Sequence, residues 1–168
     1  RGNRKDHEEA VERHAAKVGA LVELLEQELV EEGDARRRQL PEIGEMFRRA
    51  RELAPSLWER GPEDLDFLHL RVGTADLPSL TTVSVEPGGS DGLRSRLLRI
   101  PPRFATVPDV PLALDLHVLR GVGIAGPQNL ADGFARWLVL QAASLHSPAD
   151  LVIAALLADD VDGDADAA

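Results

Sequence analysis

The sequence predicts an α/β protein in which one long N-terminal helix precedes a parallel sheet with flanking helices. Three observations support this prediction. Apolar residues make up 43% of the 168 residues, which is enough for a core. Near the N-terminus they recur at helical spacing. Residues 112–158 run in the order strand, glycine-rich turn, helix and apolar run, which is the order of a strand–helix–strand unit with parallel strands.

Residues 6–32 are predicted to form the long helix. Their apolar positions alternate in steps of four and three for about three heptads, which is typical of a helix that packs along a narrow seam. Asp6 is a candidate N-cap, Glu9 is its capping-box partner, and Gly33 is a candidate stop. The seam either packs on the chain's own domain or forms a coiled-coil stalk. The second interpretation makes five residues candidates for self-association: Val11, Val18, Val22, Leu25 and Leu29.

A second helix is predicted to begin at Pro41 and to end before Pro55. Three segments with alternating or β-branched residues are predicted strands: 67–72, 80–85 and 112–119. Residues 93–100 are a basic amphipathic segment of undefined type, and the prolines within 101–111 indicate extended chain or turns. Arg60 is expected to pair with Asp64 or Asp66 and so to hold the first strand in place.

The stretch GVGIAGPQNLADGFARW, residues 121–137, has the outline of a phosphate-binding turn. A short apolar run (122–125) precedes it, a helix is predicted at 129–145, and 151–157 is predicted to be a strand buried on both faces. In the pattern G-x-x-x-x-G-K-[ST] counted from Gly126, Asp132 occupies the lysine position and Gly133 the hydroxyl position. Lysine holds the phosphates of ATP, whereas aspartate repels them. The predicted site is a degenerate phosphate turn without a catalytic residue, formed by Gly126, Pro127, Gln128, Asn129 and Asp132.

The composition excludes several classes of function. With 29 acidic and 19 basic residues, the chain as a whole is unsuited to a nucleic-acid backbone. It has no cysteine, so disulfides and thiolate sites are excluded, and its five histidines lack metal-ligand spacing, so no metal is expected. No apolar run is long enough for a membrane span, and residues 159–168 indicate an acidic, flexible tail. Because the sequence begins without methionine, we expect a piece of a longer protein.

A series of short motifs, in this order and spacing, resembles one known family. The series is LWER at 57–60, DFL at 66–68, LRVG at 70–73, LPS at 77–79, VPDVP at 107–111, GIAGP at 123–127, ARWL at 135–138 and LHSPADL at 145–151. It resembles the membrane-proximal region of FtsK/SpoIIIE-type ATPases, and within them the EccC/EssC branch of type VII secretion. The resemblance covers residues 40–158, and the helix at 6–32 fits as the segment after the family's two membrane spans.

This resemblance implies three parts: a stalk helix at 1–38, a degenerate ATPase-like domain of truncated RecA-like, P-loop type at 39–158, and the tail at 159–168. It implies that the parent is an ATPase on the cytoplasmic side of the cell membrane, while this piece is a structural and assembly domain. ATP and Mg²⁺ would bind in downstream domains, so no cofactor is expected here. The implied partners are those downstream ATPase domains, membrane-complex subunits of the secretion system and a second copy of the chain, without direct nucleic-acid binding.

Two alternatives stay open. The chain could be an active nucleotide-binding domain of an FtsK-like DNA translocase, whose turn binds ATP in an altered way. It could also be a plain protein-interaction module built on the same core. Which substrates the parent moves does not follow from these residues.

Overall fold

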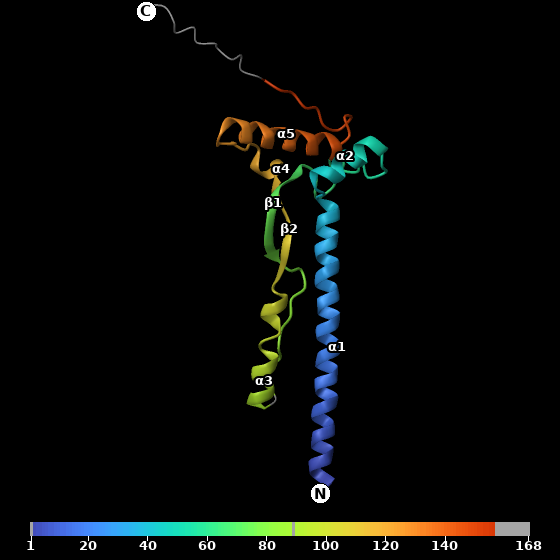
Figure 1. Cartoon of the computed structure of the whole chain (residues 1–168), viewed down its shortest axis with the longest axis vertical. Coiled ribbons are helices and arrows are strands. Elements are labelled where there is room, and N and C mark those ends of the chain that lie inside the picture. Colours follow the sequence, from blue (N-terminus) through green and yellow to red (C-terminus); the bar gives the residue numbers. More distant parts are fainter. Residues whose placement is uncertain (1, 89, 157–168) are drawn as a thin grey trace, which may run out of the picture.

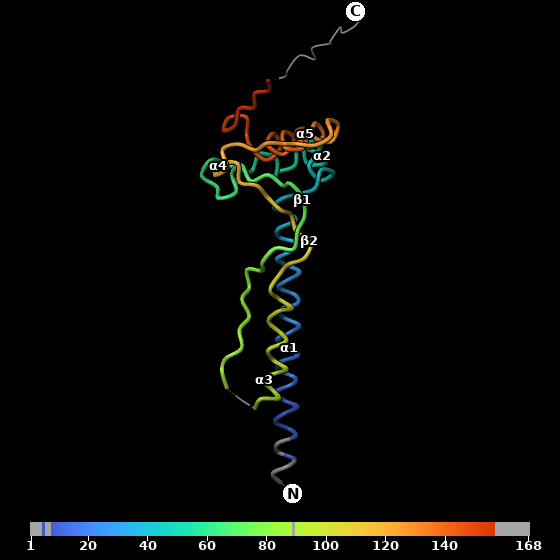
Figure 2. The backbone as a smooth tube through the Cα atoms, turned by 90° about the vertical axis from the view of Figure 1, so that its left-hand side faces the viewer, coloured from blue at the N-terminus to red at the C-terminus, as the bar shows by residue number. Residues whose placement is uncertain are grey.

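The structure, a computed structural model, describes residues 2–88 and 90–156, so the predicted tail at 159–168 lies outside it. Its elements are α1 (Gly2–Gln39), α2 (Ile43–Glu52), β1 (His69–Pro78), α3 (Asp91–Leu97), the 3₁₀ helix η1 (Pro101–Phe104), β2 (Thr106–Asp115), α4 (Leu116–Leu119) and α5 (Gln128–Leu145). Figure 1 shows two parts. The stalk consists of α1 and, alongside it, the hairpin of β1 and β2 followed by η1 and α3 further along the helix (Figures 1 and 2). The head consists of α2, α4, α5 and the connection 53–68, and lies across one end of the stalk.

The helix α1 has 38 residues and extends beyond both of its predicted ends. It has already begun before Asp6, which is therefore not the N-cap, and it continues through Gly33, the predicted stop. A β-carbon at Gly33 would lie 3.3 Å from Val107 Cγ1 of β2. The glycine thus allows close packing of α1 on the hairpin, which offsets the roughly 1 kcal/mol by which glycine weakens a helix interior. No described helix is long and apolar enough to cross a bilayer.

The apolar seam of α1 lies against the chain's own hairpin. Leu25 is buried, and Val18, Val22 and Leu29 are half-buried, whereas Val11 is 42% exposed. In the stalk α1 contacts β2 and η1, and its residues Val11 and Val18 line a pocket together with Leu93 and Leu97 of α3. The interpretation in which the seam packs within the chain therefore accounts for most of these residues, while their role in self-association stays a prediction.

Polar contacts fasten α1 to the hairpin beside this seam. The carboxylate of Glu32 accepts hydrogen bonds from Ser79 Oγ at 2.8 Å and from Leu80 N at 3.1 Å. Arg36 Nη2 donates to Pro78 O at 2.7 Å and pairs with Glu32 at 2.5 Å. These contacts satisfy backbone groups at the end of β1, where the chain leaves the sheet.

The sheet consists of β1 and β2 and is antiparallel, with His69 opposite Asp115 and Pro78 opposite Thr106. The predicted parallel sheet is therefore wrong within the described residues. The prediction assigned the parallel partner to 151–157, but 151–156 form no strand, and Val152 is 87% exposed. A strand requires a neighbour for its backbone hydrogen bonds, and this apolar run has none in the described part of the chain. Residue 157 lies outside the described residues.

The predicted strands differ from the observed ones in other ways. β1 begins at His69 and ends at Pro78, and 80–85 and 122–125 form no strand because neither has a pairing neighbour. The prediction of a strand at 112–119 is correct only up to Asp115. There Asp115 Oδ1 accepts a hydrogen bond from Val118 N at 3.0 Å, which caps α4 and ends the strand.

The prolines of β2 are compatible with a strand because β2 pairs on one side only. Pro108 and Asp109 face the single residue Asp76, which makes a bulge in the register. Asp109 has a φ of 49°, and its N–H donates to Asp76 Oδ1 at 3.0 Å. The expected extended or turning chain at 101–111 is thus η1 followed by the bulged start of β2.

The two shorter predicted helices are confirmed as α2 and α5, and the undefined basic segment contains α3. Across the head, α5 covers the edge of β1. Gln141 is fully buried, and its Oε1 accepts from Arg71 N at 2.7 Å while its Nε2 donates to Arg71 O at 2.8 Å. Trp137 Nε1 donates to the same oxygen at 3.1 Å. Side chains of α5 therefore satisfy the backbone N–H and C=O of Arg71 at the edge of β1, as the backbone of a third strand would.

Replacing Gln141 with alanine is expected to lower the free energy of unfolding by about 2–3 kcal/mol, because it leaves a buried strand N–H without an acceptor. Urea unfolding followed by circular dichroism measures this loss. Gln27→Ala is the matched control, since Gln27 is exposed on α1, and it should change the stability by less than about 0.5 kcal/mol. Equal effects of the two substitutions would contradict the assigned role of Gln141.

Candidate functional site

The predicted phosphate turn lies at the start of α5. Gly126 has a φ of 156°, and Pro127 occupies the N-cap position without a side-chain hydrogen bond. Gly126, Pro127, Gln128 and Asn129 are exposed, and Asp132 is half-buried. Gln128 Nε2 donates to Asp132 Oδ1 at 2.9 Å. The structure brings these five residues together at one helix end, but no strand leads into the turn, as one does in a phosphate loop.

The turn combines one feature that favours an anion with one that opposes it. The first turn of α5 keeps backbone N–H groups that could face an anion, with the partial positive charge of a helix N-terminus. The carboxylate of Asp132 lies one turn further and already attracts the amide of Gln128. A phosphate here would meet a negative charge where lysine normally supplies a positive one.

A second group of polar residues lies at the junction of stalk and head, with Arg60 at its centre. Arg60 is 2% exposed. Its Nη1 donates to His69 O at 2.8 Å and to Asp66 O at 3.3 Å, and its Nη2 donates to Gln39 O at 2.5 Å. Arg60 Nε lies 3.0 Å from Asp66 Oδ2, which confirms the predicted pairing with Asp66. The carboxylate of Asp64 instead accepts a hydrogen bond from Gly61 N at 2.7 Å.

The electrostatics of this junction follow from burial. Burial lowers the pKa of the Arg60 guanidinium, and the charge of Asp66 raises it again. Arginine nevertheless stays charged in proteins, so Arg60 is a buried cation whose partner is Asp66. Removing one partner of such a pair costs about 3–5 kcal/mol, because the other charge stays buried.

The segment 58–60 also binds the end of α5. Trp58 N donates to Ser144 O at 3.0 Å, Trp58 Nε1 donates to Ala143 O at 3.0 Å, and Arg60 N donates to Leu145 O at 3.0 Å. The last carbonyl groups of a helix have no partner within the helix. This segment supplies donors to the final carbonyls of α5, and the Arg60 side chain does the same for Gln39 at the end of α1. One short loop therefore caps two helices.

His146 follows α5 directly and is 1% exposed. Its Nε2 accepts a hydrogen bond from Leu68 N at 3.0 Å, and its Nδ1 lies 3.0 Å from Ala142 O. Because Nε2 accepts, the proton must be on Nδ1, and the ring is neutral. Desolvation lowers the pKa of His146, and the nearby charge of Arg60 lowers it further. The Phe67 ring meets the imidazole edge-on, with ring centres 5.0 Å apart.

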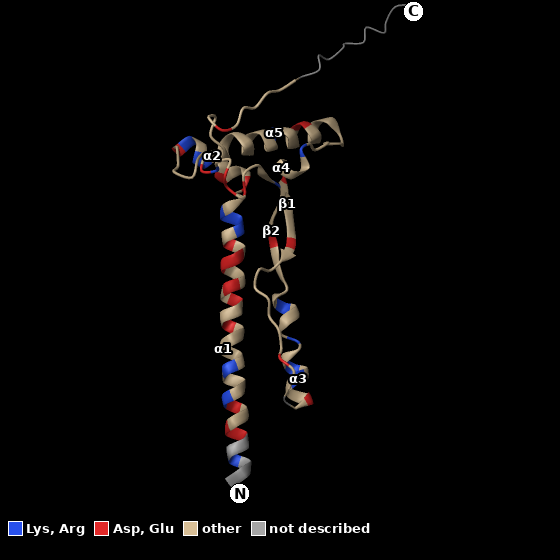
Figure 3. Cartoon of the chain, turned by 180° about the vertical axis from the view of Figure 1, so that it is seen from behind, with Lys and Arg blue, Asp and Glu red and all other residues tan. Residues whose placement is uncertain are grey.

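A third group lies on α2, where the charged residues stand out in Figure 3. Arg48 donates to Glu45 at 2.6 and 2.8 Å, and Arg49 Nε donates to Glu45 at 3.0 Å. The hydrogen bonds from Arg48, and then from Arg49, lower the pKa of Glu45 to about 2. Exposed pairs of this kind add little stability. In the described residues, no group of three or more histidines and carboxylates could hold a metal ion.

The roles of Gln141 and His146 are difficult to predict from the sequence. Their hydrogen-bond partners, Arg71 and Leu68, lie 70 and 78 residues away in the chain. The available signal was a polar residue at position 141 on the otherwise apolar side of the predicted helix. Such a residue on a buried face needs a specific partner.

No family model matches the chain. Among curated proteins, the chain is 36% identical over 109 residues to the ESX secretion system protein EccC of Geobacillus thermodenitrificans, an alignment that covers 62% of this chain and 7% of that protein. It is 32% identical over 114 residues to the ESX-4 secretion system protein EccC4 of Mycobacterium tuberculosis, covering 62% and 9%, respectively. It is 34% identical over 110 residues to EccC of Thermomonospora curvata, covering 60% and 8%. The chain thus spans less than a tenth of each relative's length.

The stability of the chain should decrease as the pH falls below about 6.5, because His146 is neutral in the folded state and protonates more readily in the unfolded state. Above that pH the ring is neutral in both states and its contribution is complete. The contribution is lost as the pH falls from the unfolded-state pKa through the lowered folded-state pKa. Urea unfolding at a series of pH values between about 7.5 and 5 measures the slope.

The matched variants are His146→Gln and His117→Gln. Replacing the buried His146 should flatten the pH slope, and the exposed His117 provides the comparison for a histidine outside the junction. A slope that persists in His146→Gln would contradict this assignment.

Proposed function

Because the chain is a relative of the EccC proteins of ESX secretion systems, as its motifs predicted, we propose that it is the part of such a protein that joins a stalk helix rigidly to a head domain. The observation that carries this proposal is the buried Arg60. Its side chain binds the end of α1 through Gln39 O and the start of β1 through His69 O, and its backbone N–H binds the end of α5. One residue therefore connects both sides of the stalk to the main helix of the head.

The physical argument for rigidity is the cost of opening this junction. Turning α1 relative to the head would remove the acceptor Gln39 O from the buried guanidinium of Arg60. Each unpaired buried donor costs about 1–3 kcal/mol, so small rotations are strongly resisted. A joint with this property transmits force and orientation from one part to the other.

The glycine turn supports a degenerate nucleotide site, and with it a piece that does not itself hydrolyse ATP. Asp132 occupies the position of the phosphate-binding lysine, and its carboxylate is engaged by Gln128. In this proposal residues 39–158, which include the hairpin as well as the head, are a degenerate ATPase-like domain, and residues 1–38 are the helix that precedes it. ATP hydrolysis would belong to other domains of the parent protein.

The relationship to EccC proteins supports further proposals on the setting of this domain. It would lie at the cytoplasmic face of the cell membrane, with α1 following membrane spans of the parent. Its partners would be the ATPase domains of the same protein and the membrane subunits of the secretion system. The chain would act on these partners by holding them at a fixed orientation.

Rigid coupling predicts a single narrow distance between stalk and head. Since the chain has no cysteine, Glu12→Cys with Arg136→Cys provides two unique spin-label sites, exposed on α1 and on α5. Electron–electron double resonance should give one narrow distance distribution. Arg60→Lys should broaden it while helicity is retained, because lysine cannot bind the same set of carbonyls.

The control for this measurement is Arg51→Lys, which changes an exposed arginine of the head and should leave the distribution narrow. A broad distribution in the chain without the Arg60 substitution would contradict the proposal of a rigid joint.

A degenerate turn predicts that MgATP leaves the amide signals of residues 126–132 unshifted in a nuclear magnetic resonance titration. The reason is the repulsion between phosphate and the Asp132 carboxylate, together with the missing lysine. Asp132→Lys is the comparison, because it restores the positive charge at that position. Saturable shifts of residues 126–132 in the unaltered chain would contradict the degenerate site and would favour an active nucleotide-binding domain.

A further inference from the structure

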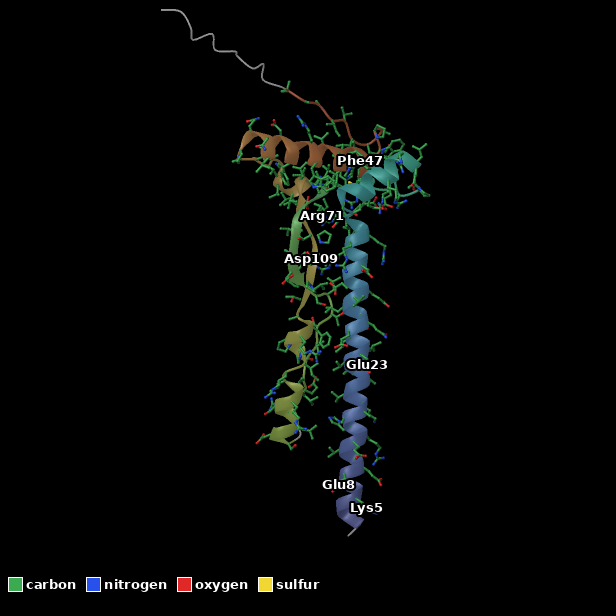
Figure 4. The ribbon with its side chains drawn as sticks, in the orientation of Figure 1. Lys5, Glu8, Glu23, Phe47, Arg71 and Asp109 are labelled. Carbon is green, nitrogen blue, oxygen red and sulfur yellow. The ribbon has the colours of Figure 1, made fainter. Side chains whose placement is uncertain are left out.

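An open cavity of about 520 Å³ lies where the end of α1 meets the start of α2. Four arginines from three elements line it: Arg37 and Arg38 in the last turn of α1, Arg49 on α2 and Arg71 on β1. Figure 3 shows basic residues at this end of α1, and Figure 4 labels Arg71 beside it. Guanidinium groups that converge from several elements are the usual protein ligands of phosphate oxygens.

Most of these arginines are held only weakly by protein carboxylates. Arg37 Nη2 lies 3.1 Å from Asp34 Oδ1, and both side chains are about half exposed. Arg71 Nη2 lies 3.4 Å from Glu42 Oε1, and the Glu42 side chain is 78% exposed. Exposed pairs contribute about 0–1 kcal/mol, so a bound oxyanion can replace either carboxylate at low cost. The Arg38 side chain has no hydrogen bond or ion pair within the described residues.

Arg49 offers a donor that is not used. Its side chain is 11% exposed, its Nε binds Glu45 and its Nη2 binds Arg38 O. Its Nη1 is buried and has no hydrogen-bond partner among the described residues; Glu59 Oε1 lies 3.8 Å away. A buried donor without an acceptor costs about 1–3 kcal/mol, so the guanidinium of Arg49 is not fully satisfied by the described residues.

The start of α2 adds backbone donors to the same cavity. Glu42 is the N-cap residue of α2, but its side chain makes no capping hydrogen bond and lies near Arg71 instead. The first-turn N–H groups of the helix are therefore not capped by a side chain, and Gly44 leaves the approach to them open. Asp34, Glu42 and Glu45 also line the cavity, so the four arginines leave one positive charge in excess. Glu45 is shared with Arg48, outside the cavity, which increases that excess.

We propose that this cavity binds a phosphate-class oxyanion, which bridges α1, α2 and β1 and stiffens the joint between stalk and head. The binding site does not depend on the assignment of the chain to a secretion protein, because it rests on the arginines and the start of α2, whereas its effect on the joint rests on the proposed function. The anion would replace the exposed carboxylates of Asp34 and Glu42 as the partner of Arg37 and Arg71. It would also give Arg38 a partner.

Calorimetric titration of the whole chain with inorganic pyrophosphate, at constant ionic strength, tests this proposal. Saturable binding with a Kd of roughly 1 mM or tighter is expected. Arg38→Gln should weaken binding by about tenfold, since it removes one charge-assisted contact. The matched control is Arg51→Gln, an exposed arginine of α2 that does not line the cavity, and it should bind as the unaltered chain does.

Both variants alter exposed side chains, and unchanged thermal melting without ligand would verify that both fold. Amide shifts caused by pyrophosphate should centre on residues 37–45 and 71. No binding, equal affinity of Arg38→Gln and Arg51→Gln, or shifts centred on residues 126–132 would each overturn the proposal. The last result would move the anion to the glycine turn.

Discussion

The arrangement of stalk and head depends on one buried charge, the guanidinium of Arg60. Burying such a group is unfavourable unless its N–H groups find acceptors, and here they come from the end of α1, from the loop before β1 and from β1 itself. None of these segments can move alone without leaving at least one N–H group of the buried guanidinium without its acceptor. His146 lies beside Arg60 and is buried as well, with the Phe67 ring against its imidazole. The position of the head on the stalk is thus a consequence of satisfying one arginine.

The same junction shows which contacts can be predicted from the sequence and which cannot. Arg60 and Asp66 are close in the chain, so their pairing could be predicted from local residues alone. The helical periodicities of α2 and α5 were equally local and were correct in type. The contacts of Gln141 and His146 join residues 70 or more positions apart, and such pairings depend on the tertiary fold. The alternation of residue types at 67–72 predicted a strand but did not indicate which other strand pairs with it.

The error in the sheet has a physical cause. A continuous apolar run such as 151–156 favours a strand covered on both faces. For this reason the run was predicted to be the parallel neighbour of the strand at 112–119. In the structure β1 takes its neighbour from β2, and α5 closes its other edge with Gln141 and Trp137. No edge of β1 is then left at this point for a third strand. Val152, Ile153 and Leu156 of the apolar run stay exposed, as do Phe47 on α2 and Leu53 directly after it, so there is apolar surface beside the head beyond its own core.

Binding of a phosphate requires positive charge and directed N–H groups at one place. A phosphate loop combines both at one helix start, whereas in this chain the glycine turn lacks the positive charge. The glycine turn has the helix end but carries a carboxylate at the position of the cation, whereas the cavity between α1 and α2 has guanidinium groups beside a helix start without a side-chain cap. Phosphoryl transfer also needs a hydroxyl ligand for Mg²⁺, and Gly133 stands in that position of the turn. An anion held by arginines alone can bind without being hydrolysed. Anion binding would then increase the stability of the joint by RT ln(1 + [L]/Kd). The anion concentration would therefore control how stiffly stalk and head are held together and would not control a rate of hydrolysis.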